Sequence, residues 1–177
     1  MKVKVKVPAT SANLGPGFDV AGLALTLYNT FTFELADQGL NITGCPEQFC
    51  NEENMTYQAF KQAAEICGLE YQGVNIECSG DVPYTRGLGS SSTCIVAGIV
   101  GAFAFKDKVE DRQEILELAT AIEGHPDNVA PAIFGGLTVS VMEEDNVLTL
   151  NIPVKHDYRF VTLIQPFTLS TVQSRTV

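Results

Sequence analysis

The chain has 177 residues, of which 45% are hydrophobic and 18% are charged, so it is long enough to bury a hydrophobic core of its own. Its 11 basic and 21 acidic residues give a formal net charge of −10, which argues against a nucleic-acid-binding or anionic-membrane-binding surface. No run of residues approaches the roughly 18 apolar residues that a membrane-spanning helix needs.

Strand patterns lie mostly at the two ends of the chain, and helical patterns lie mostly between them. Alternating and β-branched runs predict strands at residues 2–8, 23–35, 74–78, 136–142, 147–152 and 158–164. Apolar spacings of three and four residues predict helices at residues 53–67, 91–105, 112–123 and 127–134. This order favours an α+β fold of packed layers over a doubly wound sheet.

Residues 8–20 are expected to form a loop of small residues after the first strand. Asn13 and Asp19 are its only side chains that can bind a polar ligand through an amide or a carboxylate. Gly15 and Gly17 flank Pro16 and predict a tight turn of the backbone. The alternative is a turn in which the two polar side chains cap local backbone groups.

Residues 82–93 have the composition of a phosphate-binding loop. They follow a predicted strand and precede a long apolar helical run. Gly87 and Gly89 permit turns that other residues disfavour and leave room for an anion. Three successive serines at residues 90–92 place hydroxyl and N–H groups at a helix N-terminus, where the helix dipole favours negative charge. The alternative is an ordinary Gly/Ser loop before a buried helix.

Four polar side chains lie within six residues of a predicted helix junction. Glu123 ends one helix and is a suitable oxygen ligand for Mg²⁺. Asp127 or Asn128 could cap the next helix. We interpret His125 as a core histidine that is fixed by its ring N–H.

The last part of the chain predicts a second domain that is incomplete. Residues 160–164 read as a buried strand, residues 165–166 as a break, and residues 169–177 as an element with nothing to pack against. We therefore expect a domain over residues 1–153, the beginning of another over residues 154–177, and a truncated chain. Arg175 could bind a carboxylate through two hydrogen bonds, although an isolated arginine is more often a solvated surface residue.

The five cysteines show neither CxxC pairing nor histidine partners at zinc spacing. Their odd number is typical of reduced thiols, and so we expect a cytoplasmic protein.

Three segments together resemble the GHMP kinase superfamily and, within it, the homoserine kinases. They are PATSANLGPGFDVAGLAL at residues 8–25, VPYTRGLGSSSTCIVAG at 82–98 and EGHPDNVAPAIFGG at 123–136. The resemblance implies a ribosomal-protein-like two-layer N-terminal domain, with the C-terminal domain largely missing. It also implies ATP-dependent phosphorylation of L-homoserine to O-phospho-L-homoserine in threonine biosynthesis, by direct in-line transfer, with ATP and Mg²⁺. A homodimer is left open, and we expect the chain to be inactive alone.

The resemblance also implies roles for individual residues. It implies nucleotide contacts at Asn54, Pro83, Arg86, Gly87, Leu88, Gly89, Ser90, Ser91 and Ser92. It implies Mg²⁺ contacts at Ser91 and Glu123, and homoserine contacts at Asn13, Asp19, Asn128 and Arg175. Asp19 would hold the ammonium group and Arg175 the carboxylate. Asn128 and Thr171 would act at the reacting hydroxyl. Ser92 and Thr93 stand where the family often has alanines, a change that should be tolerated.

Two other functions compete with this prediction. A mevalonate-type or sugar kinase would catalyse the same phosphoryl transfer to a different alcohol substrate. Such an enzyme would not need paired sites for an ammonium group and a carboxylate. A non-catalytic anion- or RNA-binding module could use the same scaffold. The excess of acidic residues argues against RNA.

Overall fold

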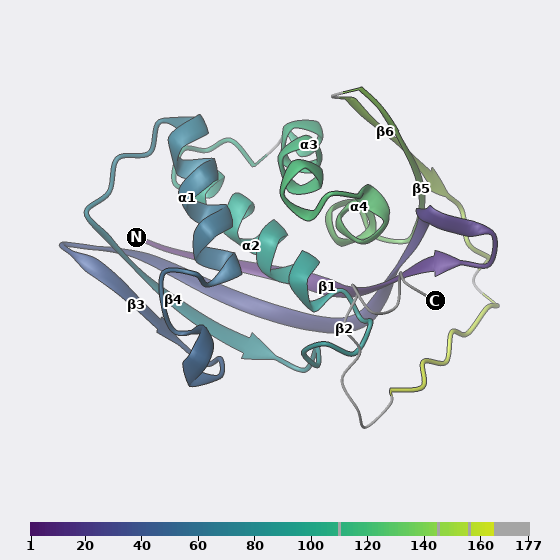
Figure 1. Ribbon diagram of the computed structural model, residues 1–177, viewed down its shortest axis with the longest axis horizontal. Helices are drawn as coiled ribbons and strands as arrows, with labels where there is room; N and C mark the ends of the chain where they lie inside the picture. Colours follow the sequence, from purple (N-terminus) through teal and green to yellow (C-terminus); the bar gives the residue numbers. More distant parts are fainter. Residues whose placement is uncertain (110, 145, 156, 165–177) are drawn as a thin grey trace.

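The computed structural model describes residues 1–109, 111–144, 146–155 and 157–164, in which four α-helices cover one face of a mixed sheet (Figure 1). The strands are β1 (Lys2–Leu14), β2 (Gly17–Ala36), β3 (Gly39–Thr43), β4 (Gly73–Gly80), β5 (Leu137–Glu143) and β6 (Asn146–Ile152). The helices are α1 (Met55–Cys67), α2 (Ser90–Ala104), α3 (Arg112–Glu123) and α4 (Pro126–Phe134), with a short 3₁₀ helix η1 (Glu47–Phe49). The predicted α+β fold is confirmed.

The long strand β2 organises the sheet. It forms an antiparallel hairpin with β1 along nearly its whole length. Its second half also pairs antiparallel with β4, whereas residues 21–23 near its start pair with β5. The sheet order is β3-β4-β2-β5-β6, with β3 and β4 parallel and β5 and β6 antiparallel.

The β1–β2 hairpin includes most of the segment that was predicted to be a loop. β1 continues to Leu14 and β2 begins at Gly17, so only a two-residue turn separates them. The pairing register shifts between Pro8 and Thr10 and again between Ala12 and Leu14. Such shifts mark β-bulges, which interrupt the alternation of apolar and polar residues by which a strand is recognised.

Two other strands differ from the prediction. The short parallel strand β3 was not predicted. The strand expected at residues 158–164 is wrong, because in the described part of this segment no residue is in a strand, and Val161 is 86% exposed. A strand needs a neighbour for its backbone N–H and C=O groups, and the sequence pattern does not supply one. The domain boundary at residues 153–154 stays a prediction.

The main core lies between the sheet and helices α1 and α2. Phe33 of β2, Phe60 of α1 and Phe103 of α2 are fully buried there. The rings of Phe33 and Phe60 stack with their centroids 5.5 Å apart. Gly101 allows the ring of Phe33 to lie directly against the α2 backbone, because a Cβ at that position would come within 2.7 Å of the ring. Helix α2 therefore packs closely against both the sheet and α1.

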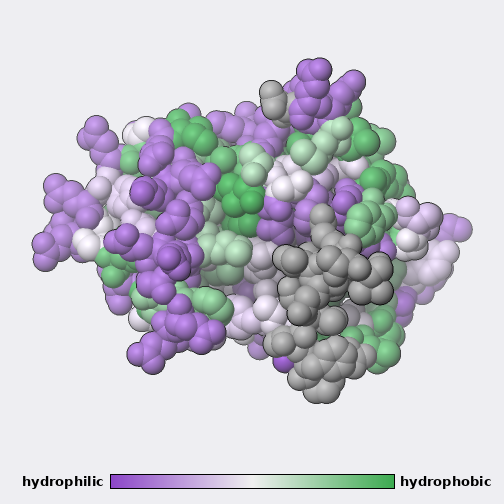
Figure 2. Space-filling view, viewed as in Figure 1, coloured by the Kyte–Doolittle hydropathy of each residue, from purple (hydrophilic) through white to green (hydrophobic). Residues whose placement is uncertain are grey.

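The β5–β6 hairpin has the reverse of the usual alternation. Val141 and Leu148 are opposite each other across the two strands and are 53% and 58% exposed. Ser140 and Thr149, the next pair, hydrogen bond to each other at 2.9 Å, and Ser140 is buried. Figure 2 shows apolar surface towards this hairpin, whereas polar residues cover the end of the molecule that holds α1 and β3. Within the residues described, no helix has the length and apolar character to cross a bilayer.

Gly98 tests the packing of α2 on α1. A Cβ at Gly98 would overlap the carbonyl oxygen of Thr56 and lie 2.8 Å from the Cβ of Ala59. Gly→Ala inside a helix normally stabilises it by about 0.5–1 kcal/mol. Here we expect Gly98→Ala to lower the free energy of unfolding by about 1–3 kcal/mol, because two backbones must separate. Urea denaturation measures this change.

Gln62→Ala on the exposed side of α1 is the matched control, and it should change stability by less than about 0.5 kcal/mol. A Gly98→Ala variant as stable as the parent chain would show that the two helices are not in close contact.

Candidate functional site

Gly89 is the point at which β1 and the N-terminus of α2 meet. It is the N-cap residue of α2, with a left-handed φ of 65°, and no side chain caps the helix there. The Thr10 N–H donates a hydrogen bond to the Leu88 carbonyl at 3.2 Å. A Cβ on Gly89 would overlap the Thr10 hydroxyl and lie 3.3 Å from Oδ1 of Asn128. The loop therefore needs glycine here for both its backbone conformation and its close approach to Thr10.

The N-terminal turn of α2 contacts the last residue of α3. The Ser91 hydroxyl donates to Oε1 of Glu123 at 2.7 Å, and the Ser92 hydroxyl donates to the same oxygen at 3.2 Å. Gly124 adopts the left-handed conformation and ends α3 there, which fixes the position of Glu123. The fold thus brings together the two residues, Ser91 and Glu123, that were predicted to share one cation.

A cavity of about 290 Å³ lies next to this turn and is lined mainly by apolar atoms. Phe49 and Tyr84 contribute rings whose centroids are 6.1 Å apart. Ser90 and Ser91 form part of its wall, so the cavity opens directly onto the N-terminus of α2. A mostly apolar cavity with a few polar groups at one end is typical of a small-ligand site.

Asn54 also lines this cavity, but its amide is used by the fold. It is the N-cap residue of α1, and its Oδ1 accepts hydrogen bonds from the N–H groups of Thr56 and Tyr57. Its Nδ2 donates to the Phe49 carbonyl at 2.8 Å. The capping role explains why the residue is an asparagine, and its expected contact with the nucleotide stays a prediction.

The other predicted nucleotide residues differ in which of their atoms can reach a ligand. The Leu88 side chain is buried with Ala9 and Val82, so only its backbone is available. Ser92 is fully buried with its hydroxyl turned towards Glu123. Gly87 has a φ of 68° and open space around its Cα. Pro83 and Arg86 are partly exposed on the loop between β4 and α2, outside the lining of the cavity.

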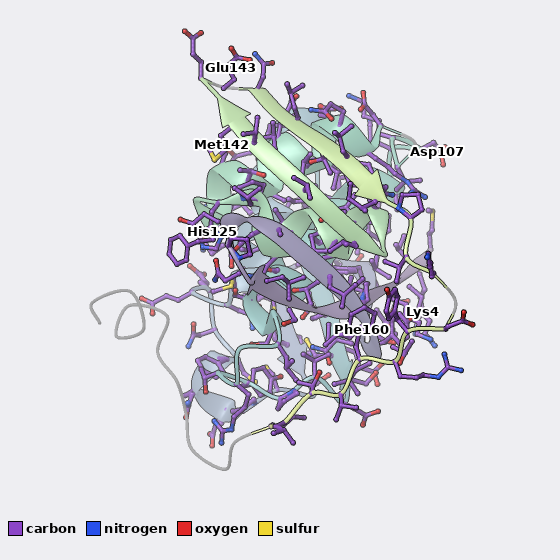
Figure 3. The ribbon with its side chains drawn as sticks, turned by 90° about the vertical axis from the view of Figure 1, so that its right-hand side faces the viewer. Lys4, Asp107, His125, Met142, Glu143 and Phe160 are labelled. Atoms are coloured by element: carbon purple, nitrogen blue, oxygen red, sulfur yellow. The ribbon has the colours of Figure 1, made fainter. Side chains whose placement is uncertain are left out.

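A second cluster lies on the other side of the Gly89–Thr10 contact, where the β1–β2 hairpin reaches α4. Carboxylate oxygens of Asp19 and Asp127 and a ring nitrogen of His125 all lie within 4.8 Å of one another. Nδ1 of His125 is paired with Oδ1 of Asp127. Asp127 is completely buried, and its Oδ2 has no hydrogen-bond partner among the described residues. Figure 3 shows His125 near the turn of the hairpin.

The cluster corrects the prediction that Asp127 or Asn128 caps α4. The N-cap residue is His125 and Pro126 occupies the first helical position, so neither side chain is a cap. The prediction that a ring nitrogen fixes His125 agrees with its bond to Asp127. The spacing His-x-Asp across a helix start was the signal that could have identified Asp127 as part of the site.

Asn13, Asp19 and Asn128 all lie at this end of the molecule. Oδ1 of Asn13 accepts the N–H of Asp19 at 2.8 Å, so Asn13 has the local capping role that was the alternative interpretation. Oδ1 of Asn128 accepts the Thr10 hydroxyl at 2.7 Å, and its Nδ2 donates to Oδ1 of Asp127 at 3.4 Å. Asn128 therefore links the second cluster to the Gly89–Thr10 contact. Thr171 and Arg175 lie outside the described residues.

Comparison with known proteins agrees with this arrangement. Residues 54–136 match the family model of the GHMP kinases N-terminal domain. The chain therefore contains a region similar to the N-terminal domain of the GHMP kinases.

Over almost its whole length the chain is similar to homoserine kinases. It is 48% identical to one from Clostridium botulinum (strain Eklund 17B / Type B) and 49% identical to one from Clostridium beijerinckii, covering 99% of this chain in both cases. A solved homoserine kinase from Cytophaga hutchinsonii superposes with a TM-score of 0.73 at 27% identity and covers 98% of this chain and 63% of that one. The chain spans 59% of the length of the two curated relatives.

Gly89 and Gly87 form a matched pair for testing the close approach. Both have positive φ, but only Gly89 lies against another residue. We expect Gly87→Ala to cost about 1 kcal/mol of stability from backbone strain alone. Gly89→Ala should cost about 1–3 kcal/mol more, because its Cβ displaces Thr10. Equal losses in chemical denaturation would show that the contact with Thr10 is not tight.

The thiols around the cavity predict a loss of stability at alkaline pH. Burial raises the pKa of Cys78 from 9.0 to about 12 and that of Cys45 from 9.0 to about 11. In the unfolded chain these thiols ionise near 9.0, so above that pH the native state binds more protons than the unfolded state. The contribution of these thiols to the free energy of unfolding should therefore be constant below about pH 9 and fall as pH rises towards 11–12.

Urea denaturation over this pH range measures the effect. The Cys78→Ala variant should show a shallower fall than the parent chain, since one of the contributing thiols is gone. Identical slopes for the two proteins would contradict the raised pKa of Cys78.

Proposed function

We propose that this chain binds Mg·ATP and L-homoserine and forms the larger part of an active site for ATP-dependent phosphorylation of L-homoserine to O-phospho-L-homoserine. The observation that carries the proposal is the placement of two chemically different clusters on either side of the Gly89–Thr10 contact. The α2 N-terminus with Ser91 and Glu123 suits a polyphosphate and its cation. The Asp19, His125 and Asp127 cluster suits a cationic group.

The nucleotide half of the site uses backbone groups more than side chains. Gly87 and Gly89 leave the loop backbone open to a phosphate, and the uncapped first turn of α2 offers N–H groups at the positive end of the helix dipole. The cavity beside Phe49 and Tyr84 would take the nucleobase. This placement explains how a protein with a net charge of −10 could bind ATP.

Glu123 and Ser91 would hold Mg²⁺. Their oxygens are hard ligands, and magnesium is usually bound by one or two protein oxygens together with substrate phosphates. When bound, the ion would neutralise charge on the phosphates and favour transfer of the terminal phosphoryl group. Glu123 at the end of α3 and Ser91 in the first turn of α2 are held in place by two different helices.

The homoserine half of the site matches a substrate with a positive ammonium group. Asp19 would bind that group, and the buried Asp127, whose Oδ2 has no partner among the described residues, adds a second carboxylate. Asn128 would aim the hydroxyl, since it lies between this cluster and Gly89. Arg175 and Thr171 are proposed for the carboxylate and the reacting centre.

Direct in-line transfer needs no strong general base. Phosphoryl transfer proceeds through a loose transition state, and catalysis relies mostly on positioning and charge neutralisation. The residues next to the proposed hydroxyl position, Asn128 and Thr10, are neutral. The absence of a strong base among these two residues is consistent with a site that acts mainly by positioning its two substrates. A mevalonate-type or sugar substrate has no ammonium group for Asp19 to bind.

Release of ADP from Mg·ATP tests the activity. It is measured with L-homoserine, mevalonate and galactose, on this chain and on a form continued to the length of its curated relatives. We expect only the longer form to be active, and only with L-homoserine. If the longer form releases no ADP with L-homoserine, the proposal that Asp19 and Asn128 bind this substrate is wrong.

Two substitutions separate the halves of the site. In the longer form, Asp19→Asn should raise KM for L-homoserine at least tenfold and leave the affinity for Mg·ATP unchanged, since a lost charge-assisted contact costs about 1.5–3 kcal/mol. Asp37→Asn, at an exposed position between β2 and β3, is the matched control. Glu123→Gln should instead raise the Mg²⁺ concentration needed for activity. If Asp19→Asn changes the Mg·ATP affinity as much as the KM, the two halves are not separate.

A further inference from the structure

Two thiols face each other at the edge of the cavity beside Phe49 and Tyr84. Cys45 follows β3 and Cys50 follows η1, so one turn of 3₁₀ helix separates them. Their sulfur atoms are 3.5 Å apart. A disulfide needs about 2.05 Å, and so a small movement of one turn would allow the bond to form.

We propose that Cys45 and Cys50 are a redox modification site: a peroxide converts them to an intramolecular disulfide, and this bond is coupled to occupation of the adjacent nucleotide cavity. The peroxide first oxidises the Cys50 sulfur to a sulfenic acid and is itself reduced to water or an alcohol. The Cys45 thiol then attacks the Cys50 sulfur and gives up its proton, the S–S bond forms, the S–O bond of the sulfenic acid breaks, and its oxygen leaves with that proton as water. Two thiols are oxidised for each peroxide reduced.

The positions of the five thiols favour this pair. Cys50 is exposed, whereas Cys67 and Cys78 are buried and Cys45 and Cys94 are partly buried. Cys50 is thus the sulfur that meets a dissolved oxidant first. Burial raises the pKa of Cys45 to about 11, so its thiol keeps its proton at neutral pH and is the less reactive of the two towards dissolved peroxide. Its position 3.5 Å from the Cys50 sulfur makes it the resolving group. The fifth thiol, Cys67, lies in α1 and contacts carbonyl oxygens of α1 and α2.

The turn between the two thiols is part of the cavity wall. Cys45 and Phe49 both line the cavity, and the Phe49 ring faces Tyr84 across it. The Phe49 carbonyl is held by Nδ2 of Asn54 at the start of α1. Closing the sulfur–sulfur distance pulls on this turn and changes the position of the Phe49 ring. A ligand that fits the cavity when the thiols are reduced should therefore fit less well after oxidation.

Coupling between the two sites must act in both directions. If the disulfide weakens Mg·ATP binding, bound Mg·ATP must disfavour the disulfide by the same factor. This part of the proposal rests on the proposed function, because it takes Mg·ATP as the ligand of the cavity. The formation of the disulfide does not depend on that assignment.

Peptide mapping tests the bond. The chain is treated with hydrogen peroxide, its remaining thiols are alkylated, and it is cleaved after glutamate. Cleavage after Glu47 puts Cys45 and Cys50 on different peptides, which stay joined only if the disulfide is present. We expect a joined pair that a reductant separates. Cys50→Ser should abolish it, and Cys67→Ala should leave it intact. Overoxidised Cys50 without a joined pair would overturn the proposal.

Calorimetry tests the coupling. The dissociation constant of Mg·ATP should be about fivefold or more larger for the oxidised chain than for the reduced chain, the lower end of typical coupling between sites. The Cys50→Ser variant should bind Mg·ATP equally well before and after peroxide. A joined pair with unchanged affinity would overturn the coupling. A reduced chain that does not bind Mg·ATP would instead overturn the proposed function, while the mapped disulfide would stand.

Discussion

The close contact between Gly89 and the Thr10 side chain is the constraint on which the site depends. No side chain fits between the two residues, and the same threonine bonds to the loop backbone at Leu88 and to the side chain of Asn128. Three elements that are far apart in the sequence are thus fixed at one point. The α2 N-terminus lies on one side of this point and the α4 N-terminus on the other. A loop that were free to move at Gly89 could hold neither cluster at a constant distance from the other.

The β1–β2 hairpin carries one of these clusters to its place. Gly22 of β2 lies against the Asp127 carbonyl so closely that a Cβ would overlap it, and the Thr138 hydroxyl donates to the Gly22 carbonyl at 3.3 Å. The register shifts after Pro8 and Ala12 change the course of the hairpin before its turn. Asp19 therefore reaches His125 and Asp127 from the start of β2, next to the turn of the hairpin. Figure 1 shows that this turn lies far from the N-terminal end of β1.

The parts of the site that were predictable are those built from neighbouring residues. Gly87, Gly89 and the serines lie in one short segment, and a helix N-terminus after two glycines has few other uses. The role of Asp127 was missed, because a polar residue at a helix start is also a normal cap and only the tertiary structure shows that it is buried beside Asp19. The helices were predictable to within two residues at most ends, since their apolar faces and glycine stops are local signals.

The strands were less predictable, for two different reasons. β2 was recognised from its second half, where apolar residues alternate against β4, but not from its first half, where small residues approach α4. The strand expected at residues 158–164 had a suitable composition, but these residues are not in a strand. Strand formation depends on a partner elsewhere in the chain, which a local pattern cannot identify.

The reversed alternation of the β5–β6 hairpin makes the stability of the sheet uneven. Of the aliphatic side chains in this hairpin, only Val147 is buried, and the Ser140–Thr149 hydrogen bond lies where apolar contacts would usually be. Opening the hairpin exposes little additional apolar surface, whereas opening β2 or β4 exposes the phenylalanine core. The sheet therefore has a region that can open locally while the core and both clusters stay folded.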